Sequence, residues 1–287
     1  MRNEPIPDAA ASEQPSLEDV RRFWDENPLW TGEGAAIPGT RAFFEEHSRV
    51  YHTDCFAGTL DERIFELPAT SGRVLDLGCG IGFWLIEFWN RGFRNITGAD
   101  LSPASLAIAA QRCALYGVDA ELSEQNAEAL TFPDGSFDHV NCQGVVHHTP
   151  DTRKAIMEIH RVLVPGGTAS ISVYFRNFAL RNWTVLRPFA RLAAMAGSRL
   201  EGRGREDIYR LDDADDIVRI YDGARNPIGK AYSEAEFIEL LQPYFLIEKT
   251  YFHFFPARSL PFRIPRGLHR FLDHQLPFMV YFNLRRR

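Results

Sequence analysis

Short apolar runs alternate with amphipathic segments along the middle of the chain. From Arg73 onward, each apolar run ends near glycine, aspartate or asparagine and is followed by apolar residues at helical spacing. Strands that alternate with helices of about 10–15 residues predict a parallel sheet covered on both faces. The expected strands, including two late ones near the C-terminus, are residues 73–77, 95–100, 118–126, 137–142, 168–174, 244–251 and 279–284.

Capping signals mark where several helices begin and end. Serine or threonine side chains can accept hydrogen bonds from the first free N–H groups of a helix, and glycine commonly follows its last turn. Ser102 before Pro103 predicts a helix that ends at Gly117. The other expected helices are residues 16–27, a short one from 40, 83–91, 151–163 and 233–241.

The chain divides into four kinds of segment. We expect a flexible tail over residues 1–15, an aromatic-rich N-terminal helical lid over 16–71, and a core over 72–175 and 233–287. Residues 176–232 break the alternation and predict a helical insertion over one end of the sheet. The arginines of the insertion are residues 176, 181, 187, 191, 199, 203, 205 and 210.

Composition excludes several classes of protein. The net charge of -6 leaves no basic excess to neutralise phosphates, which disfavours a nucleic-acid partner. No apolar run is long enough to span a membrane, and the N-terminus lacks a secretory leader, so we expect a cytoplasmic protein. The four cysteines form no C-x-x-C pair, so we expect no structural metal site. The sequence does not indicate an oligomeric state.

A glycine-rich turn after the first expected strand is the strongest local signal. The run V-L-D-L-G-C-G-I-G covers residues 74–82, and glycines in such a turn let a ligand approach the backbone closely. A dinucleotide site would have a third glycine where Phe83 stands. Asp76 would also repel a pyrophosphate, whereas a cationic ligand would be favoured there.

A second carboxylate completes the description of the ligand. Asp100 ends the next expected strand, about 20 residues further on, where an acid can accept both ribose hydroxyl protons. This position disfavours a ribose phosphate but suits a bare ribose. The expected ligand therefore has a ribose, a positive charge and no phosphate, and S-adenosylmethionine meets these three conditions.

The middle of the chain resembles the class I S-adenosylmethionine-dependent methyltransferases. It is most similar to the small-molecule group related to the quinone C-methylases, which carry the methyltransferase type 11 domain. The resemblance covers about residues 72–175, and its motifs are V-L-D-L-G-C-G-I-G, I-T-G-A-D-L-S-P, Q-N-A-E-A-L-T-F-P-D-G-S-F-D-H-V, V-V-H-H-T-P-D and R-V-L-V-P-G-G. It implies a Rossmann-like α/β fold with a seven-stranded, mostly parallel sheet whose last strand is antiparallel.

The resemblance also implies roles for individual residues. Asp100 would hold the ribose, Leu101 would lie against the adenine, and Asn126 with the Ala127 backbone would meet the adenine edge. Asn126 departs from the aspartate common in the family, although an amide oxygen can still accept from the adenine amine. Gln143 and Gly144 would pass beside the sulfonium. The methionine half would be lined by Asp76, Gly78, Cys79, Gly80 and Gly82.

Methyl transfer to a protonated acceptor atom needs a base. His147 and His148 follow the fourth expected strand, and ligands in open parallel sheets bind beyond the carboxyl ends of the strands. We expect one of them, preferably His148, to accept the proton, the alternative being that one packs in the core. Tyr174 ends the fifth strand and can either close over the acceptor or cap the sheet. The acceptor itself, a small organic molecule methylated on O, N or C, is not identified.

Two further features leave alternatives open. The aromatic residues of the N-terminal segment can form a lid over the sulfonium or pack the helices onto the sheet; they are Phe23, Trp24, Trp30, Phe43, Phe44 and Tyr51. The arginines of the insertion can form a solvated face or converge on an anionic acceptor. The rival functions are a nicotinamide dehydrogenase, a protein that binds S-adenosylmethionine without transferring methyl, and a cofactor-dependent enzyme of another reaction type.

Overall fold

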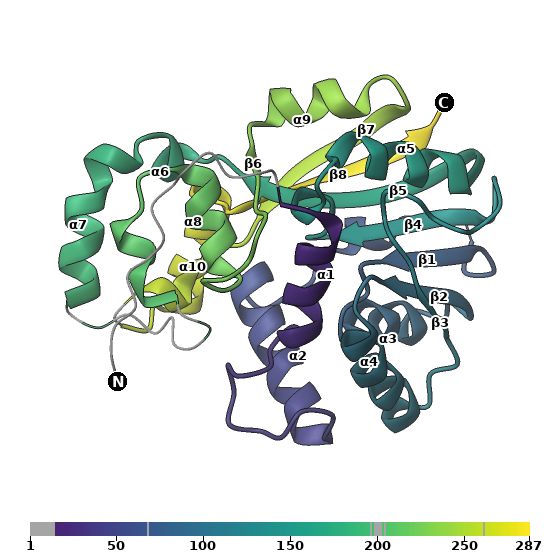
Figure 1. Ribbon diagram of the computed structural model, residues 1–287, viewed down its shortest axis with the longest axis horizontal. Coiled ribbons are helices and arrows are strands. Elements are labelled where there is room, and N and C mark those ends of the chain that lie inside the picture. The colour runs from purple at the N-terminus through teal and green to yellow at the C-terminus, as the bar shows by residue number, and fades with distance from the viewer. Residues whose placement is uncertain (1–14, 68, 196, 198–202, 204, 261) are drawn as a thin grey trace.

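A mixed β-sheet with helices on both faces forms the centre of the molecule (Figure 1). The computed structural model describes residues 15–67, 69–195, 197, 203, 205–260 and 262–287. The expected tail therefore lies outside the described residues, apart from Pro15. The strands are β1 Arg73–Leu77, β2 Asn95–Asp100, β3 Glu121–Glu124, β4 Phe137–Gln143, β5 Leu163–Phe175, β6 Ala231–Tyr232, β7 Phe245–His253 and β8 Met279–Arg286.

The sheet has the order β3-β2-β1-β4-β5-β8-β7, and the short strand β6 pairs with the end of β5. The first five strands are parallel, whereas β8 runs antiparallel to both β5 and β7. The expected mostly parallel sheet with an antiparallel last strand is confirmed. The sheet holds eight strands rather than the expected seven, because the additional strand β6 has only two residues and shows no periodic pattern.

Both faces of the sheet are buried, as parallel strands require. Successive side chains of a strand point to opposite faces. Val74 accordingly packs in one core cluster with residues of α3, while Leu75 and Leu77 pack in another with residues of α5. The α-helices are α1 Leu17–Glu26, α2 Arg41–Phe56, α3 Phe83–Asn90, α4 Pro103–Tyr116, α5 Thr152–Val162, α6 Phe178–Arg181, α7 Trp183–Met195, α8 Ala214–Tyr221, α9 Glu234–Leu241 and α10 Arg266–Gln275.

The caps expected from the sequence form where they were placed. Ser16 and Ser233 each complete a capping box, and the Ser102 hydroxyl accepts from the Ser105 N–H. Two expectations were wrong in extent. Helix α2 is longer than expected, at 16 residues, and β5 begins at Leu163 rather than at Thr168. Helix α10 was not predicted.

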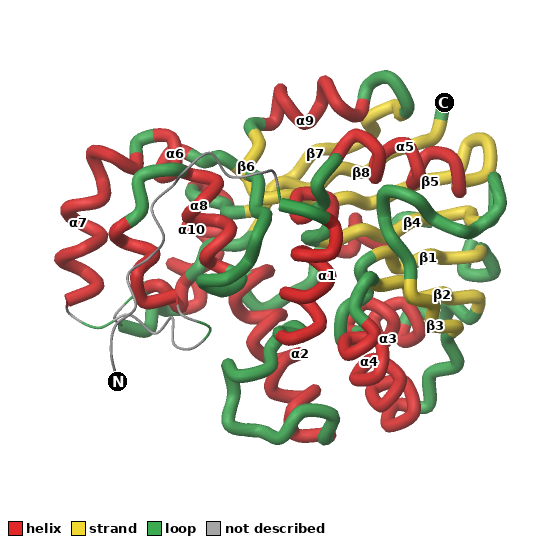
Figure 2. The backbone as a smooth tube through the Cα atoms, viewed as in Figure 1, coloured by secondary structure: helices red, strands yellow, loops and turns green. Residues whose placement is uncertain are grey.

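The N-terminal helices and the insertion lie beyond the carboxyl ends of the strands (Figure 2). Helix α1 is joined to the start of α4, because the Asp25 carboxylate accepts from the Ser102 hydroxyl at 3.0 Å and from the Ala104 N–H at 2.9 Å. Helix α8 of the insertion lies against β6 and so reaches the end of β5. Segments far apart in the sequence therefore surround the edge where the glycine turn lies.

Candidate functional site

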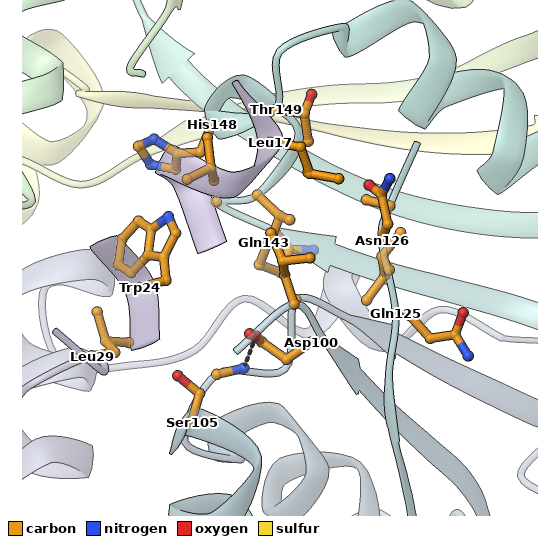
Figure 3. A pocket seen from close by; sticks show the side chains of 18 of the residues that line it. Leu17, Trp24, Leu29, Asp100, Ser105, Gln125, Asn126, Gln143, His148 and Thr149 are labelled. Atoms are coloured by element: carbon orange, nitrogen blue, oxygen red, sulfur yellow. Dashed lines mark hydrogen bonds between the residues drawn. The ribbon is translucent and has the colours of Figure 1, made fainter. Parts of the chain in front are cut away.

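Two adjoining pockets lie at the carboxyl edge of the sheet. The first pocket extends over the glycine turn, and the second lies between α1, α2, the insertion and the C-terminal segment. Figure 3 shows Gln143 in the middle of the first pocket, with Trp24 and His148 to one side and Asn126 to the other. The residues that line both pockets are Trp24, Leu29, Gln143, Gly144 and His148.

The glycines of the turn serve different purposes. Gly78 has a φ of +73°, and a Cβ there would lie 2.2 Å from a methyl carbon of Val145, so close packing requires glycine. Gly80 has a φ of +50°, but a Cβ there would meet no atom within 4 Å. Gly80 therefore leaves open space on the wall of the first pocket, where a ligand can approach the backbone.

Asp100 links the turn to the second strand. Its Oδ2 accepts from the Gly80 N–H at 2.8 Å, drawn as a dashed line in Figure 3, and its Oδ1 accepts from the Ser102 N–H at 2.9 Å. Burial raises the pKa of Asp100, although the backbone donors oppose this shift. Each carboxylate oxygen keeps a further lone pair, so Asp100 can also accept from ligand hydroxyls in the first pocket.

The residues expected to contact an adenine lie on the other side of the first pocket. Leu101, Asn126 and Ala127 all line it. The Asn126 Oδ1 accepts from the Glu128 N–H at 2.9 Å, which fixes the side chain. The sequence missed several residues that also line this pocket, namely Leu17, Val20, Ser105, Gln125, Thr149 and Pro150.

Asp76 is buried directly behind the turn. Its Oδ1 accepts from the Asn141 amide at 2.7 Å, whereas its Oδ2 is buried and has no hydrogen-bond partner within the described part of the chain. Burial raises the pKa of Asp76 to about 7, and the neighbouring Asp100 adds to the shift. A buried carboxylate oxygen without a partner is costly, so a cationic ligand group would stabilise it.

Three of the residues expected beside the methionine half do not line the first pocket. They are Asp76, Cys79 and Gly82. The Cys79 Sγ lies 3.1 Å from where a Cβ of Gly98 would be, so its side chain packs within the core. Gly82 precedes α3 and packs against Ala109. Cys79 and Gly82 therefore contribute to a ligand site only through the shape of the turn.

A hydrogen-bonded chain of amides fixes Gln143 between the pockets. Its Nε2 donates to the Asn141 Oδ1 at 2.9 Å and to the Ser170 Oγ at 2.9 Å. Asn141 in turn donates to Asp76, so the chain runs from the carboxylate to the pocket wall. The Gln143 Oε1 is buried and accepts no hydrogen bond from any described residue. This oxygen is therefore available to a ligand where the two pockets meet.

His148 belongs to a polar cluster in the second pocket. Its Nε2 lies 3.1 Å from the Asp222 Oδ2, which also accepts from the Tyr174 hydroxyl at 2.7 Å. Its Nδ1 lies 2.6 Å from the backbone oxygen of Ile228, which can only accept, so Nδ1 carries a proton. Asp222 lies 74 positions from His148, and no sequence pattern indicates that the two residues pair.

His147 has a different environment from its neighbour. It is fully buried, lines neither pocket, and neither of its ring nitrogens has a hydrogen-bond partner among the described residues. Burial lowers the pKa of His147 well below its usual range, so the ring is neutral. Its ring centroid lies 4.2 Å from that of His148 and 4.4 Å from that of Tyr174. In this position His147 can support the rings of His148 and Tyr174, whereas it is not placed to contact a ligand in either pocket.

The aromatic residues of the N-terminal segment divide between the two expected alternatives. Trp24 lines both pockets, and Trp30 and Tyr51 line the second. Phe43 and Phe44 line neither pocket and are packing residues in a small buried cluster that also contains Trp30 and Ile81. Phe23 packs its ring edge-on against Trp24.

The arginines of the insertion also divide, with some pointing inward and others lying at the surface. Arg203 and Arg205 point inward and pair with Glu33, with side chains 4% and 3% exposed. Arg176 and Arg187 instead pair with acidic residues at the surface. Arg199 lies outside the described residues.

The comparisons with known proteins agree with this arrangement. Residues 74–167 match a family model described as a methyltransferase domain. A demethylmenaquinone methyltransferase of Thermus thermophilus is 38% identical over 96 residues, 33% of this chain and 44% of that protein. A ubiquinone biosynthesis O-methyltransferase of Pseudomonas entomophila is 36% identical over 120 residues, 41% of this chain and 50% of that protein. The chain thus matches half or less of each relative's length.

A solved structure extends the likeness of fold beyond the matched sequence. A S-adenosylmethionine-dependent methyltransferase from Methanosarcina mazei aligns with a TM-score of 0.57 and 20% identity, over 79% of this chain and 98% of that one. The expected Rossmann-like fold is therefore confirmed. Within the described residues, no helix is long and apolar enough to cross a membrane.

Proposed function

We propose that this chain, whose core is a class I S-adenosylmethionine-dependent methyltransferase domain related to quinone methyltransferases, transfers a methyl group to a small organic acceptor in the second pocket. The observation that carries the proposal is the meeting of the two pockets at Gln143, Gly144 and His148. A donor in the first pocket and an acceptor in the second would be in contact there. The acceptor atom, O, N or C, is left open.

The residues present fit S-adenosylmethionine. The unpartnered Oδ2 of Asp76 suits its ammonium group, Gly80 leaves space at the backbone, and Asp100 suits its ribose hydroxyls. When bound, the cofactor would supply an activated methyl carbon to the acceptor's electron pair, with its sulfur as a leaving group that would become a neutral thioether. The protein then has to align the two molecules and exclude water.

We assign these tasks to the helical segments at the carboxyl edge. Trp24 on α1 lines both pockets, and Asp25 on the same helix holds α1 against the start of α4. Helix α1 would thus act as the lid expected from residues 16–71. The insertion supplies Arg205, Tyr221 and Asp222 to the second pocket, which suits the expected role of residues 176–232 as a cap over the acceptor.

His148 and Asp222 would act together as the base. The Ile228 oxygen fixes the His148 ring, and His148 and Tyr174 both contact the Asp222 carboxylate, which lines the second pocket. The proton released by the acceptor would pass to this pair, with no need for the ring to turn. His147 would position the pair through its ring contacts.

A cytoplasmic location remains a prediction.

The affinity for cofactor is expected to rise with pH up to about pH 7 and then level off. Because the pKa of Asp76 is raised to about 7, the carboxyl is protonated below that pH and must lose its proton to pair with an ammonium. The same shift means that the cofactor-free protein loses stability as the pH rises through about 7. The measurement is calorimetry with S-adenosylhomocysteine from pH 5.5 to 8.5. The affinity should rise by up to about tenfold per pH unit below pH 7 and change little above it.

Asp76→Asn is the control for this pH dependence. Its amide oxygen can still accept from Asn141, but the side chain no longer titrates. The variant should bind more weakly at pH 8, with an affinity that changes little between pH 5.5 and 8.5. A wild-type profile without a break near pH 7 would contradict the assigned contact with the ammonium.

The proposed function is tested by ligand choice and by methyl transfer. Calorimetry should detect S-adenosylhomocysteine and no binding of NAD, because Phe83 replaces the third dinucleotide glycine and Asp76 lies behind the turn. A metabolite screen with a methyl-labelled donor should then label a small organic acceptor. Binding of NAD would support the dehydrogenase alternative. Cofactor binding with product formed but no label transferred would support another reaction type.

A further inference from the structure

One helix of the insertion turns an apolar face to solvent. Val185, Phe189 and Leu192 are 70%, 70% and 67% exposed, and they follow one another along α7 at spacings of four and three residues. Residues at these spacings share one face of a helix. Met195, at the end of α7, is 85% exposed. A helix at a protein surface ordinarily turns such a face toward the core, so this face of α7 lacks a partner.

The contacts of α7 with the rest of the insertion fix this orientation. The Trp183 Nε1 donates to the Leu211 backbone oxygen at 2.7 Å, and Trp183 packs against one of the core clusters. The Arg191 Nε donates to the Tyr209 backbone oxygen at 3.1 Å. The helix is therefore attached by its other side, and its apolar face remains outermost.

Helix α10 has the same property. Its Leu268 and Phe271 are 45% and 60% exposed, whereas His269 and Asp273 of the same helix are buried. Figure 1 places α7 at the end of the molecule opposite the parallel strands, with α10 in the same half. Large apolar side chains that gather on one part of a surface, rather than singly, indicate an interaction site.

The segments that contain these two helices are rich in arginine. Residues 178–200 contain four arginines and no aspartate or glutamate, and so do residues 254–272, although the whole chain has a net charge of -6. Five of these arginines are exposed and pair with no carboxylate among the described residues: Arg181, Arg191, Arg263, Arg266 and Arg270. The apolar helices are therefore accompanied by positive charge that the protein itself does not neutralise.

The acidic stretch 212–216 follows the same insertion but is engaged elsewhere. Asp212 pairs with Arg187, and Asp216 pairs with Arg219 at 2.9 Å. Asp213 accepts from two backbone N–H groups at the start of α8. These carboxylates therefore do not neutralise the exposed arginines of α6 and α7.

We propose that the exposed faces of α7 and α10 bind the surface of an anionic lipid bilayer. An interfacial helix places its apolar side chains at the boundary between headgroups and acyl chains, while its basic residues attract anionic lipids. Exposed guanidinium groups suit lipid phosphates, which they can bind through two parallel hydrogen bonds. A second copy of the chain fits less well, because a two-fold contact would bring the same arginines against one another. The proposal does not depend on methyl transfer.

The test is flotation of the full chain with two kinds of vesicle, one of phosphatidylglycerol and phosphatidylcholine in equal parts and one of phosphatidylcholine alone. The chain is expected to bind the anionic vesicles about tenfold or more tightly, and this binding should weaken as salt is added. Phe189→Ser should weaken it about tenfold, because a large apolar side chain no longer enters the bilayer. Arg181→Gln and Arg191→Gln should each weaken it about fivefold.

Two matched controls lie outside α7 and α10. Ile37→Ser removes an apolar side chain that is 73% exposed in the loop before α2, and Arg153→Gln removes an exposed arginine of α5. Both should leave vesicle binding unchanged. Equal binding to the two vesicles, or wild-type binding by Phe189→Ser, would overturn the proposal. It would also be overturned by a chain that binds neither vesicle, or by one that sediments as a dimer which Phe189→Ser dissociates; a protein partner or a second copy would then cover this face.

Discussion

Replacing Asp222 with asparagine is expected to lower the rate of methyl transfer about 100-fold while leaving the affinity for S-adenosylhomocysteine unchanged. The amide oxygen can still accept from the Tyr174 hydroxyl, so the shape of the cluster is kept. The negative charge that receives the acceptor's proton is lost, and a positioned base contributes about 100-fold to 10,000-fold in rate. The measurement is transfer of the labelled methyl group to the acceptor found in the screen.

Two further variants accompany this measurement: one is a matched control, and the other tests the second member of the pair. Asp216→Asn changes a carboxylate on α8, the helix that ends just before Asp222. Asp216 pairs with Arg219 away from both pockets, so this variant should leave the rate unchanged. His148→Ala should lower turnover at least tenfold, again with cofactor affinity intact. If Asp222→Asn turned over as fast as the wild type, the pair would be excluded as the base.

Asp100→Asn is expected to weaken binding of S-adenosylhomocysteine about 100-fold. The two carboxylate oxygens of Asp100 accept from the Gly80 and Ser102 N–H groups, so an amide must turn its NH₂ toward one of these donors. One buried N–H would lose its partner, and the ribose hydroxyls would lose a charged acceptor. Hydrogen bonds to charged groups contribute about 1.5–3 kcal/mol each, and about 2.7 kcal/mol corresponds to 100-fold.

Glu124→Gln is the control, because Glu124 is paired with Asp100 in the sheet register but bonds at the surface to Arg21. Calorimetry on all three proteins, together with their unfolding in urea, separates a loss of binding from a loss of stability. Wild-type affinity in a well-folded Asp100→Asn protein would contradict the assigned ribose contact.

Much of the first pocket could be predicted from the sequence, because it depends on interactions between residues that are close in the chain. The caps at Ser16, Ser102 and Ser233 depend on side chains that bond to a backbone a few residues away, so sequence spacing determines them. The glycine turn and Asp100 are also close in sequence and joined by one hydrogen bond. Helix α10 was missed because Pro265 begins it without any side-chain cap, within a segment rich in proline and phenylalanine.

By itself, the sequence determined the sheet, the glycine turn and the kind of ligand that the turn suits, because strand periodicity, capping and positive φ act over a few residues. Only the tertiary structure decided the second pocket, since its lining extends from Trp24 to Tyr281 and depends on how four segments pack. The same packing brought Asp222 to His148 and turned Arg205 inward. No local pattern encodes such pairings, because the burial that fixes them comes from residues distant in the chain.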